Sequence, residues 1–179
     1  MSDVLRYAGF WSRLYANLID SIVNVPLVVL GWPGMLSREA SIVAAVPLFV
    51  VGAGYNVVMH ARWGQTLGKM EAGIKVLTVD CDPIGWRRAM LRNSVEVGFG
   101  IISTAATIVT LLHLPASTFS LDWRQQAEAH TNALPAWGRH AGTLAGLWFW
   151  SELLVLLFNR KRRALHDFIA GTIVVRVAD

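Results

Sequence analysis

The chain has 179 residues, of which 54% are hydrophobic and only 16% are charged. Charged residues make up about a quarter of a soluble domain, so this composition argues against a soluble protein. It predicts a single integral membrane domain over residues 1–179, with the lipid bilayer as its surroundings. The formal charge of +4 does not indicate a nucleic-acid partner, because the basic residues border apolar segments and the usual nucleic-acid motifs are missing.

Four apolar stretches are long enough to cross a hydrocarbon core of about 30 Å, which takes roughly 20 helical residues. They cover about residues 14–32, 40–59, 94–114 and 141–158. We therefore expect an all-α polytopic membrane protein, a bundle of four transmembrane helices. The longer connections are residues 60–93 and residues 115–140.

Polar side chains line one face of the first apolar stretch. Arg13, Asn17, Asp20 and Asn24 follow one another at offsets of four, seven and eleven residues, which fall within a narrow sector of an α-helix. Apolar side chains cover the rest of the segment. This is the reverse of a soluble amphipathic helix, and it is typical of a membrane helix that turns a few polar groups toward a protein interior.

The second stretch ends near Asn56 and His60 and leads into the connection 60–93. Within that connection, residues 73–79 alternate and are rich in β-branched side chains, which predicts a short strand. Residues 171–177 of the tail have the same character. We expect these two short strands to pair beneath the bundle, because a lone strand leaves its backbone groups unpaired.

The third and fourth stretches each carry an acidic residue. Glu96 begins a face that continues with hydroxyl side chains at helical spacing, and Glu152 lies inside the fourth stretch. Those hydroxyls can also bond to carbonyls of their own helix, so a simple packing face is the alternative interpretation. Between the two stretches, residues 123–129 predict a surface helix.

The orientation follows from the basic residues, because Lys and Arg gather on the cytoplasmic side of a membrane protein. Thirteen of the sixteen would lie on one side of the proposed spans, which puts both termini and residues 60–93 in the cytoplasm. The connection 115–140 then faces outward. The three basic residues on the outer side are Arg38, Arg124 and Arg139.

With this orientation, Asp20, Glu96 and Glu152 all lie in the cytoplasmic half of the bilayer. An Asp at the centre of a membrane helix costs about 2.5–3.5 kcal/mol on insertion scales, so such groups are paired, hydrated or neutralised. Two interpretations are open at this point. The acidic groups form a cation- or proton-binding site, or they belong to a buried polar clamp that fixes the packing of the helices.

Three blocks of the sequence, in order, resemble the RDD family of bacterial membrane proteins, which is named for one Arg and two Asp. Arg13 and Asp20 resemble the first two of these residues, and Asp167 resembles the last. Glu71 is a departure, since relatives commonly carry an apolar residue there. The blocks are Tyr7-Ala-Gly-Phe-Trp-Ser-Arg-Leu-Tyr-Ala-Asn-Leu-Ile-Asp20, Gly64-Gln-Thr-Leu-Gly-Lys-Met70 with Gly73-Ile-Lys-Val76, and Leu165-His-Asp-Phe-Ile-Ala-Gly-Thr-Ile-Val-Val175.

The resemblance implies a protein of the bacterial cytoplasmic (inner) membrane, grouped with transporters, some of whose relatives exchange monovalent cations for protons. Asp167 enters the analysis only through this resemblance. It follows a basic cluster at the cytoplasmic edge, so Arg13 is its expected ion-pair partner across the bundle, and the pair would tie the tail to the first helix.

The first functional hypothesis is therefore transport of Na+, K+ or H+, with Arg13 and Asp167 gating or bracing the cytoplasmic side. Four helices leave little room for a pathway, so we expect a homo-oligomer. The alternative is a non-transporting membrane scaffold or assembly factor that binds partner proteins. The cation- or proton-binding residues of the first hypothesis are Asp20, Asn17, Asn24 and Glu96, with Glu152, His60 and Asn56 as secondary candidates.

An enzyme is not expected, because no motif for a nucleophile with its base and no phosphate-binding glycine loop is present. Cys81 is the single cysteine, so an internal disulfide is impossible and Cys-x-x-Cys spacing is absent. We accordingly expect neither a metal site nor a cofactor.

Overall fold

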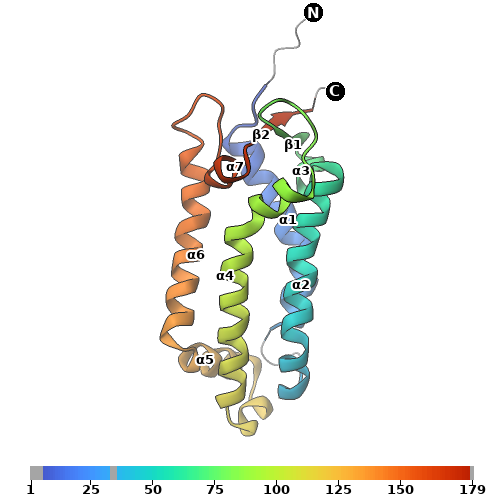
Figure 1. Ribbon diagram of the computed structural model, residues 1–179. Coiled ribbons are helices and arrows are strands. Elements are labelled where there is room, and N and C mark those ends of the chain that lie inside the picture. Colours follow the sequence, from blue (N-terminus) through green and yellow to red (C-terminus); the bar gives the residue numbers. More distant parts are fainter. Residues whose placement is uncertain (1–5, 33–35, 178–179) are drawn as a thin grey trace, which may run out of the picture. The chain divides into compact units, whose positions relative to one another are not determined.

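The computed structural model describes residues 6–32 and 36–177. That part of the chain is mostly helical and carries one small sheet (Figure 1). Its elements, in chain order, are α1 (Phe10–Leu30), α2 (Arg38–Trp63), α3 (Leu67–Glu71), β1 (Ile74–Thr78), α4 (Trp86–His113), the 3-10 helix η1 (Ala116–Ser120), α5 (Trp123–Ala133), α6 (Ala136–Val155), α7 (Leu165–Ala170) and β2 (Thr172–Arg176).

Among the described residues, three helices are long and apolar enough to cross a membrane: α1, α2 and α4. The fourth span expected from the sequence, at 141–158, corresponds to α6, which does not meet the same criterion. The physical reason is its composition, since Arg139, His140 and Glu152 interrupt its apolar residues.

The ends of the helices differ from the apolar stretches. Residues 60–63 and 86–93, expected in a connection, belong to α2 and α4, while residues 156–158, expected in a helix, follow the end of α6. Hydropathy marks only the part of a helix that can face lipid. The backbone hydrogen bonds of a helix continue through good helix formers such as Arg, whatever their polarity.

The two predicted strands are confirmed. β1 and β2 pair antiparallel, with Val76 opposite Val174 (Figure 1). On its other edge, β2 receives the segment before α1, because Tyr7 forms a bridge with Val175 and the backbone N–H of Ala8 donates to the carbonyl oxygen of Val174 (2.9 Å). Three parts of the chain that are far apart in sequence thus meet at one small sheet.

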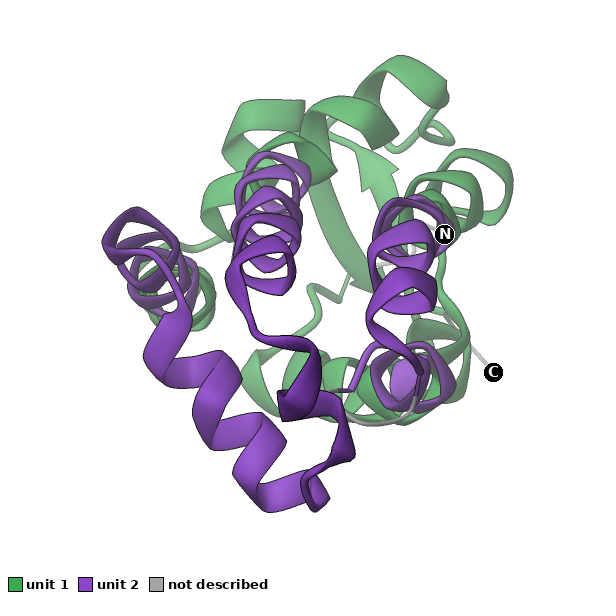
Figure 2. Ribbon diagram, turned by 90° about the horizontal axis from the view of Figure 1, so that it is seen from below, with its two compact units in different colours: residues 1–23, 54–95, 147–179 green, residues 24–53, 96–146 purple. Residues whose placement is uncertain are grey.

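The chain divides into two compact units (Figure 2). Unit 1 contains residues 1–23, 54–95 and 147–179, and unit 2 contains residues 24–53 and 96–146. The buried core of unit 1 lies where the sheet meets small side chains of the helices, and its residues are Ala8, Ala16, Ile74, Val76, Ile84, Ala89 and Val174. This arrangement leaves the candidate residues Arg13, Asp20 and Asp167 in one unit.

Unit 2 is packed through small residues. A Cβ added at Gly138 would lie 2.6 Å from the Cβ of Ala106, so α6 and α4 approach closely there. Arg38 at the start of α2 donates from Nε to the carbonyl oxygen of Leu111 (2.8 Å), near the end of α4. Many large apolar side chains nevertheless point outward, including Val43 at 74% exposed. Such a surface is expected when the solvent is lipid.

Candidate functional site

Asp20 on α1 is enclosed by groups from α2 and from the segment around α3. The hydroxyl groups of Thr66 and Tyr55 donate to its Oδ2 (2.5 Å) and Oδ1 (3.1 Å). The backbone N–H of Gly68 donates to Oδ1 as well (2.9 Å). The Asp20 side chain is 13% exposed. Two of these three donors are hydroxyl groups, whose oxygens can also coordinate a cation.

The local sequence explains how this segment reaches α1. Gly64 has a φ of +69°, a backbone conformation that favours glycine, and turns the chain after α2. Thr66 is the N-cap of α3, and its hydroxyl oxygen accepts from the backbone N–H of Lys69. A Cβ at Gly68 would collide with the carbonyl oxygen of Ala16, so only glycine permits α3 to lie this close to α1.

Lys69 places a positive charge near Asp20. Its Nζ lies 3.9 Å from Asp20 Oδ2 and 3.4 Å from Thr66 Oγ1, and its side chain is 12% exposed. Burial, followed by the positive charge of Arg92, lowers the pKa of Lys69 from 10.5 to about 8, although the charge of Asp20 acts in the opposite direction. The ammonium group is therefore charged at neutral pH.

Asp167 on α7 has a different environment. It is fully buried and forms ion pairs with Arg13 of α1 (2.7 Å to Nη1) and with Arg92 of α4. Its Oδ2 also accepts from the backbone N–H of Ala164 (2.9 Å), and its Oδ1 accepts from the hydroxyl of Thr172 (3.0 Å). The ion pair expected between Arg13 and Asp167 is thus present. Arg92 forms a second ion pair with the same carboxylate.

This cluster keeps Asp167 ionised. Burial alone would raise the pKa of Asp167, but the charges of Arg92 and Arg13 outweigh it and hold the pKa well below the usual value of 3.8. A carboxylate that is buried, doubly paired and fully hydrogen-bonded has no free position for another cation. The arrangement can fix α7 to α1 and α4, and it is not suited to binding an ion.

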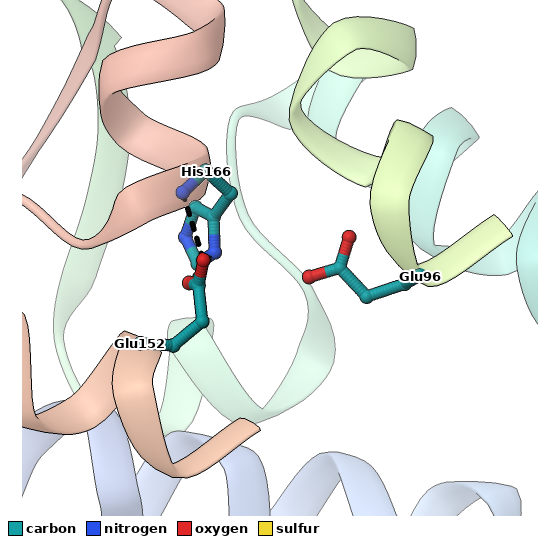
Figure 3. Close-up of side chains that lie close together, drawn as sticks. All are labelled: Glu96, Glu152 and His166. Atoms are coloured by element: carbon teal, nitrogen blue, oxygen red, sulfur yellow. Dashed lines mark hydrogen bonds and ion pairs between the residues drawn. The ribbon is translucent and has the colours of Figure 1, made fainter. Parts of the chain in front are cut away.

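His166, beside Asp167, connects this cluster to α6. Figure 3 shows the Glu152 carboxylate directed at the His166 ring, and the two are in close contact through Oε2 and Nδ1. Glu152 Oε1 also accepts from the backbone N–H of His166 (2.8 Å). On the other side of the ring, Arg92 Nη2 lies 2.5 Å from Nε2.

The state of His166 follows from its partners. A guanidinium group can only donate, so Nε2 accepts from Arg92 and the ring proton resides on Nδ1, facing Glu152. Burial, reinforced by the positive charge of Arg92, lowers the pKa of His166 well below 6.5, which agrees with a neutral ring. Glu152, His166, Arg92, Asp167 and Arg13 form one continuous chain of polar contacts across unit 1.

Three further candidates are Asn17, Asn24 and Glu96. Asn17 is half-buried, and its backbone carbonyl accepts from the hydroxyl of Ser21. Asn24 and Glu96 belong to unit 2, and Glu96 is exposed. Glu96 is also drawn in Figure 3.

The two candidates at the end of α2 contact each other. The carbonyl oxygen of Asn56 lies 2.7 Å from Nδ1 of His60, and the His60 ring is buried. Because a carbonyl oxygen only accepts, Nδ1 carries the proton. Nε2 of His60 has no hydrogen-bond partner among the described residues.

Sequence reasoning missed most of the partners of the two aspartates. The partners that it does not propose as site residues are Tyr55, Thr66, Lys69, Arg92 and His166. A signal existed for three of them, because Thr66 and Lys69 lie in the second resembling block and His166 lies in the third.

Comparison with known proteins independently supports the resemblance to the RDD family. The pattern of the RDD family matches residues 7–171. The uncharacterized protein YckC of Bacillus subtilis (strain 168) is 24% identical over 176 residues, which cover 96% of this chain and 86% of YckC. The uncharacterized membrane protein YteJ of the same organism is 27% identical over 182 residues, covering 94% of this chain and 80% of YteJ. No solved structure matches this chain.

Proposed function

Because the chain belongs to the RDD family of membrane proteins, we propose that it exchanges monovalent cations, Na+ or K+, for protons across the bacterial inner membrane. Asp20 is the cation-binding carboxylate, and Arg13 and Asp167 brace the cytoplasmic side. The observation that carries the proposal is the environment of Asp20. Its carboxylate lies among hydroxyl oxygens, and the ammonium group of Lys69 lies 3.9 Å from Oδ2, beyond hydrogen-bond distance.

The contrast with Asp167 supports this assignment. Asp167 is fully buried and receives guanidinium groups in direct contact, whereas Asp20 is 13% exposed and its counter-charge is held loosely. A buried direct pair is costly to break, while a loose pair at an accessible carboxylate leaves room for exchange. Of the two aspartates, Asp20 is therefore the one suited to bind and release a cation.

The sheet supports a topology with four spans and both termini in the cytoplasm. β1 follows α2, and β2 ends the chain, yet the two strands are hydrogen-bonded to each other. The chain between β1 and β2 therefore begins and ends on the same side of the membrane. On this proposal α4 crosses the membrane and α6 crosses back. Tyr7, which precedes α1, also bridges to β2. The chain therefore enters α1 and leaves α2 on the same side, so that α2 returns the chain that α1 carries across. The excess of basic residues assigns this side to the cytoplasm.

A pathway through four helices is narrow, so we propose that the transporting form is a homo-oligomer. The expectations that the protein needs no cofactor, binds no nucleic acid and is not an enzyme stay predictions.

The test uses purified protein in liposomes. An imposed gradient of Na+ or K+ drives a pH change inside the vesicles of the wild type, and Asp20→Asn reduces that flux to the level of empty liposomes, since an amide cannot balance the charge of a cation. Asp82→Asn is the matched control, because it removes an exposed carboxylate from a turn. Wild-type protein that folds but shows no flux above empty liposomes overturns the proposal, as does full flux in Asp20→Asn.

The second candidate function, a non-transporting scaffold, is favoured by one observation. The same contacts that surround Asp20 also fasten α3 to α1. On this alternative, Asp20→Asn loosens residues 64–71 and changes cross-linking to partner proteins in native membranes, while wild-type liposomes remain impermeable. Those two measurements separate the candidates.

A further inference from the structure

Lys69 presents an ammonium group to the Asp20 carboxylate without binding it tightly. Its Nζ lies 3.9 Å from Asp20 Oδ2 and 3.4 Å from Thr66 Oγ1. A tight ammonium–carboxylate hydrogen bond has a length of about 2.7–2.9 Å. Arg13 and Asp167 in the same unit reach that length, at 2.7 Å. The Lys69–Asp20 contact is therefore a longer electrostatic association, and withdrawal of the ammonium breaks only a long hydrogen bond to Thr66 Oγ1, at 3.4 Å.

The ammonium of Lys69 also uses the oxygens that a metal cation would use. A hard cation takes carboxylate and other oxygen ligands, and both the carboxylate of Asp20 and the hydroxyl of Thr66 lie within 4 Å of Nζ. Two positive charges this close repel each other strongly in a partly buried setting. Lys69 and a bound Na+ or K+ therefore compete for one position.

The backbone around Lys69 is held in place by other groups. The Gly68 N–H donates to Asp20, and the hydroxyl of Thr66 donates to the same carboxylate. The Lys side chain is a flexible four-carbon stem. Its ammonium can withdraw while α3 remains docked on α1.

We propose that the Lys69 ammonium is a tethered counter-ion, which occupies the cation position at Asp20 and must withdraw before Na+ or K+ binds. This inference rests on the proposed exchange function and adds an internal competitor to it. The consequence is a site that never leaves the Asp20 charge uncompensated on a membrane helix, and that binds cations only weakly.

The test measures cation affinity in liposomes for the wild type and Lys69→Met. Initial flux is recorded against the concentration of NaCl or KCl, with choline chloride keeping the ionic strength constant. Removing the competitor lowers the half-saturating cation concentration at least about tenfold. Lys69→Arg, which keeps the charge, does not lower it. Lys161→Met is the matched control, since it removes an exposed lysine and leaves the half-saturating concentration unchanged.

The outcomes separate this inference from the proposed function. Asp20-dependent flux with an unchanged half-saturating concentration in Lys69→Met overturns the tethered counter-ion and leaves exchange in place. The absence of Asp20-dependent flux in the wild type overturns both. Should Lys69→Met fail to fold, as judged by gel filtration, Lys69→Gln removes the charge while keeping a donor for Thr66, and the same comparison applies.

Discussion

At the scale of single residues, the two aspartates differ in what holds their charge. Asp167 is surrounded by Arg13, Arg92, Thr172 and the backbone N–H of Ala164. The contacts with Arg13, Arg92 and Thr172 join α7 to α1, α4 and β2, and the contact with Ala164 caps α7 itself. Asp20 has one lysine at a distance and hydroxyl groups in contact. The same residue type is therefore a fastening in one place and a candidate binding group in the other.

Asp167→Asn tests whether the contacts of Asp167 hold α7 in place and stabilise the fold. Removal of this carboxylate leaves the guanidinium groups of Arg13 and Arg92 buried without a counter-charge, and we expect a loss of about 3–5 kcal/mol in the free energy of unfolding. Unfolding by a denaturing detergent measures it. Asp82→Asn, at an exposed turn, should change that energy by less than about 0.5 kcal/mol.

The contribution of Asp167 to the free energy of unfolding decreases at acidic pH. The pKa of Asp167 is lower in the folded protein than in the unfolded chain, so its contribution is complete above pH 3.8 and is lost as the pH falls below that value. The Asp167→Asn variant should therefore lose less of its free energy of unfolding than the wild type when the pH is lowered. Equal stabilities of the wild type and Asp167→Asn at neutral pH would contradict the fastening role.

Much of this residue-level chemistry was not predictable from the sequence. The stripe on the first helix identified Arg13 and Asp20 because one helix aligns residues by its own period. The hydrogen-bond donors Tyr55, Thr66 and Gly68 lie 35 to 48 positions after Asp20, and Lys69 follows directly after them. The Arg92–Asp167 pair spans 75 positions. The helical period relates only residues within one helix and cannot predict contacts between residues so far apart. The roles of Lys69 and Arg92 can therefore be seen only in the tertiary structure.

At the scale of elements, the sequence predicted the long helices, both strands and the surface helix α5, because each has a clear period or composition. It did not predict α3. A helix of five residues has no stability of its own, since forming the first turn fixes several residues for one hydrogen bond. Its existence depends on Thr66 as its cap and on the contact of Gly68 with α1.

Gly68→Ala tests that dependence. The added Cβ would collide with the Ala16 carbonyl and lie 2.9 Å from Asp20 Cγ, so we expect α3 to separate from α1 and to lose the hydrogen bond to Asp20. Limited trypsin digestion measures this, because a released segment is cut after Lys69 several times faster, while cleavage after the exposed Lys161 stays the same.

Gly85→Ala is the control for that experiment, since a Cβ at Gly85 meets nothing within 4 Å. It should leave the digestion pattern unchanged. If Gly68→Ala is cut after Lys69 no faster than Gly85→Ala, the close approach of α3 to α1 does not depend on the glycine.

At the scale of the whole molecule, the number of spans decides where the C-terminus lies. Within residues 6–32 and 36–177, three helices are long and apolar enough to cross a membrane, and an odd number of spans would put the two ends of the chain on opposite sides. The pairing of β1 with β2 requires an even number between them. α6 is less apolar than the other long helices because it carries Arg139, His140 and Glu152, and Glu152 contacts His166. The proposed topology of four spans requires α6 to cross the membrane as well.

Thiol labelling distinguishes these topologies, because the chain has a single cysteine, Cys81, and it is exposed. In a Cys81→Ser background, Val177→Cys reports on the C-terminal strand and Ser120→Cys reports on the connection 115–140, since both positions are exposed. With four spans, a membrane-impermeant maleimide labels Ser120→Cys in intact cells. It labels Cys81 and Val177→Cys only in inverted membrane vesicles. Labelling of Val177→Cys in intact cells, with Cys81 protected, would mean that α6 does not cross and that β1 and β2 cannot pair in the membrane-embedded protein.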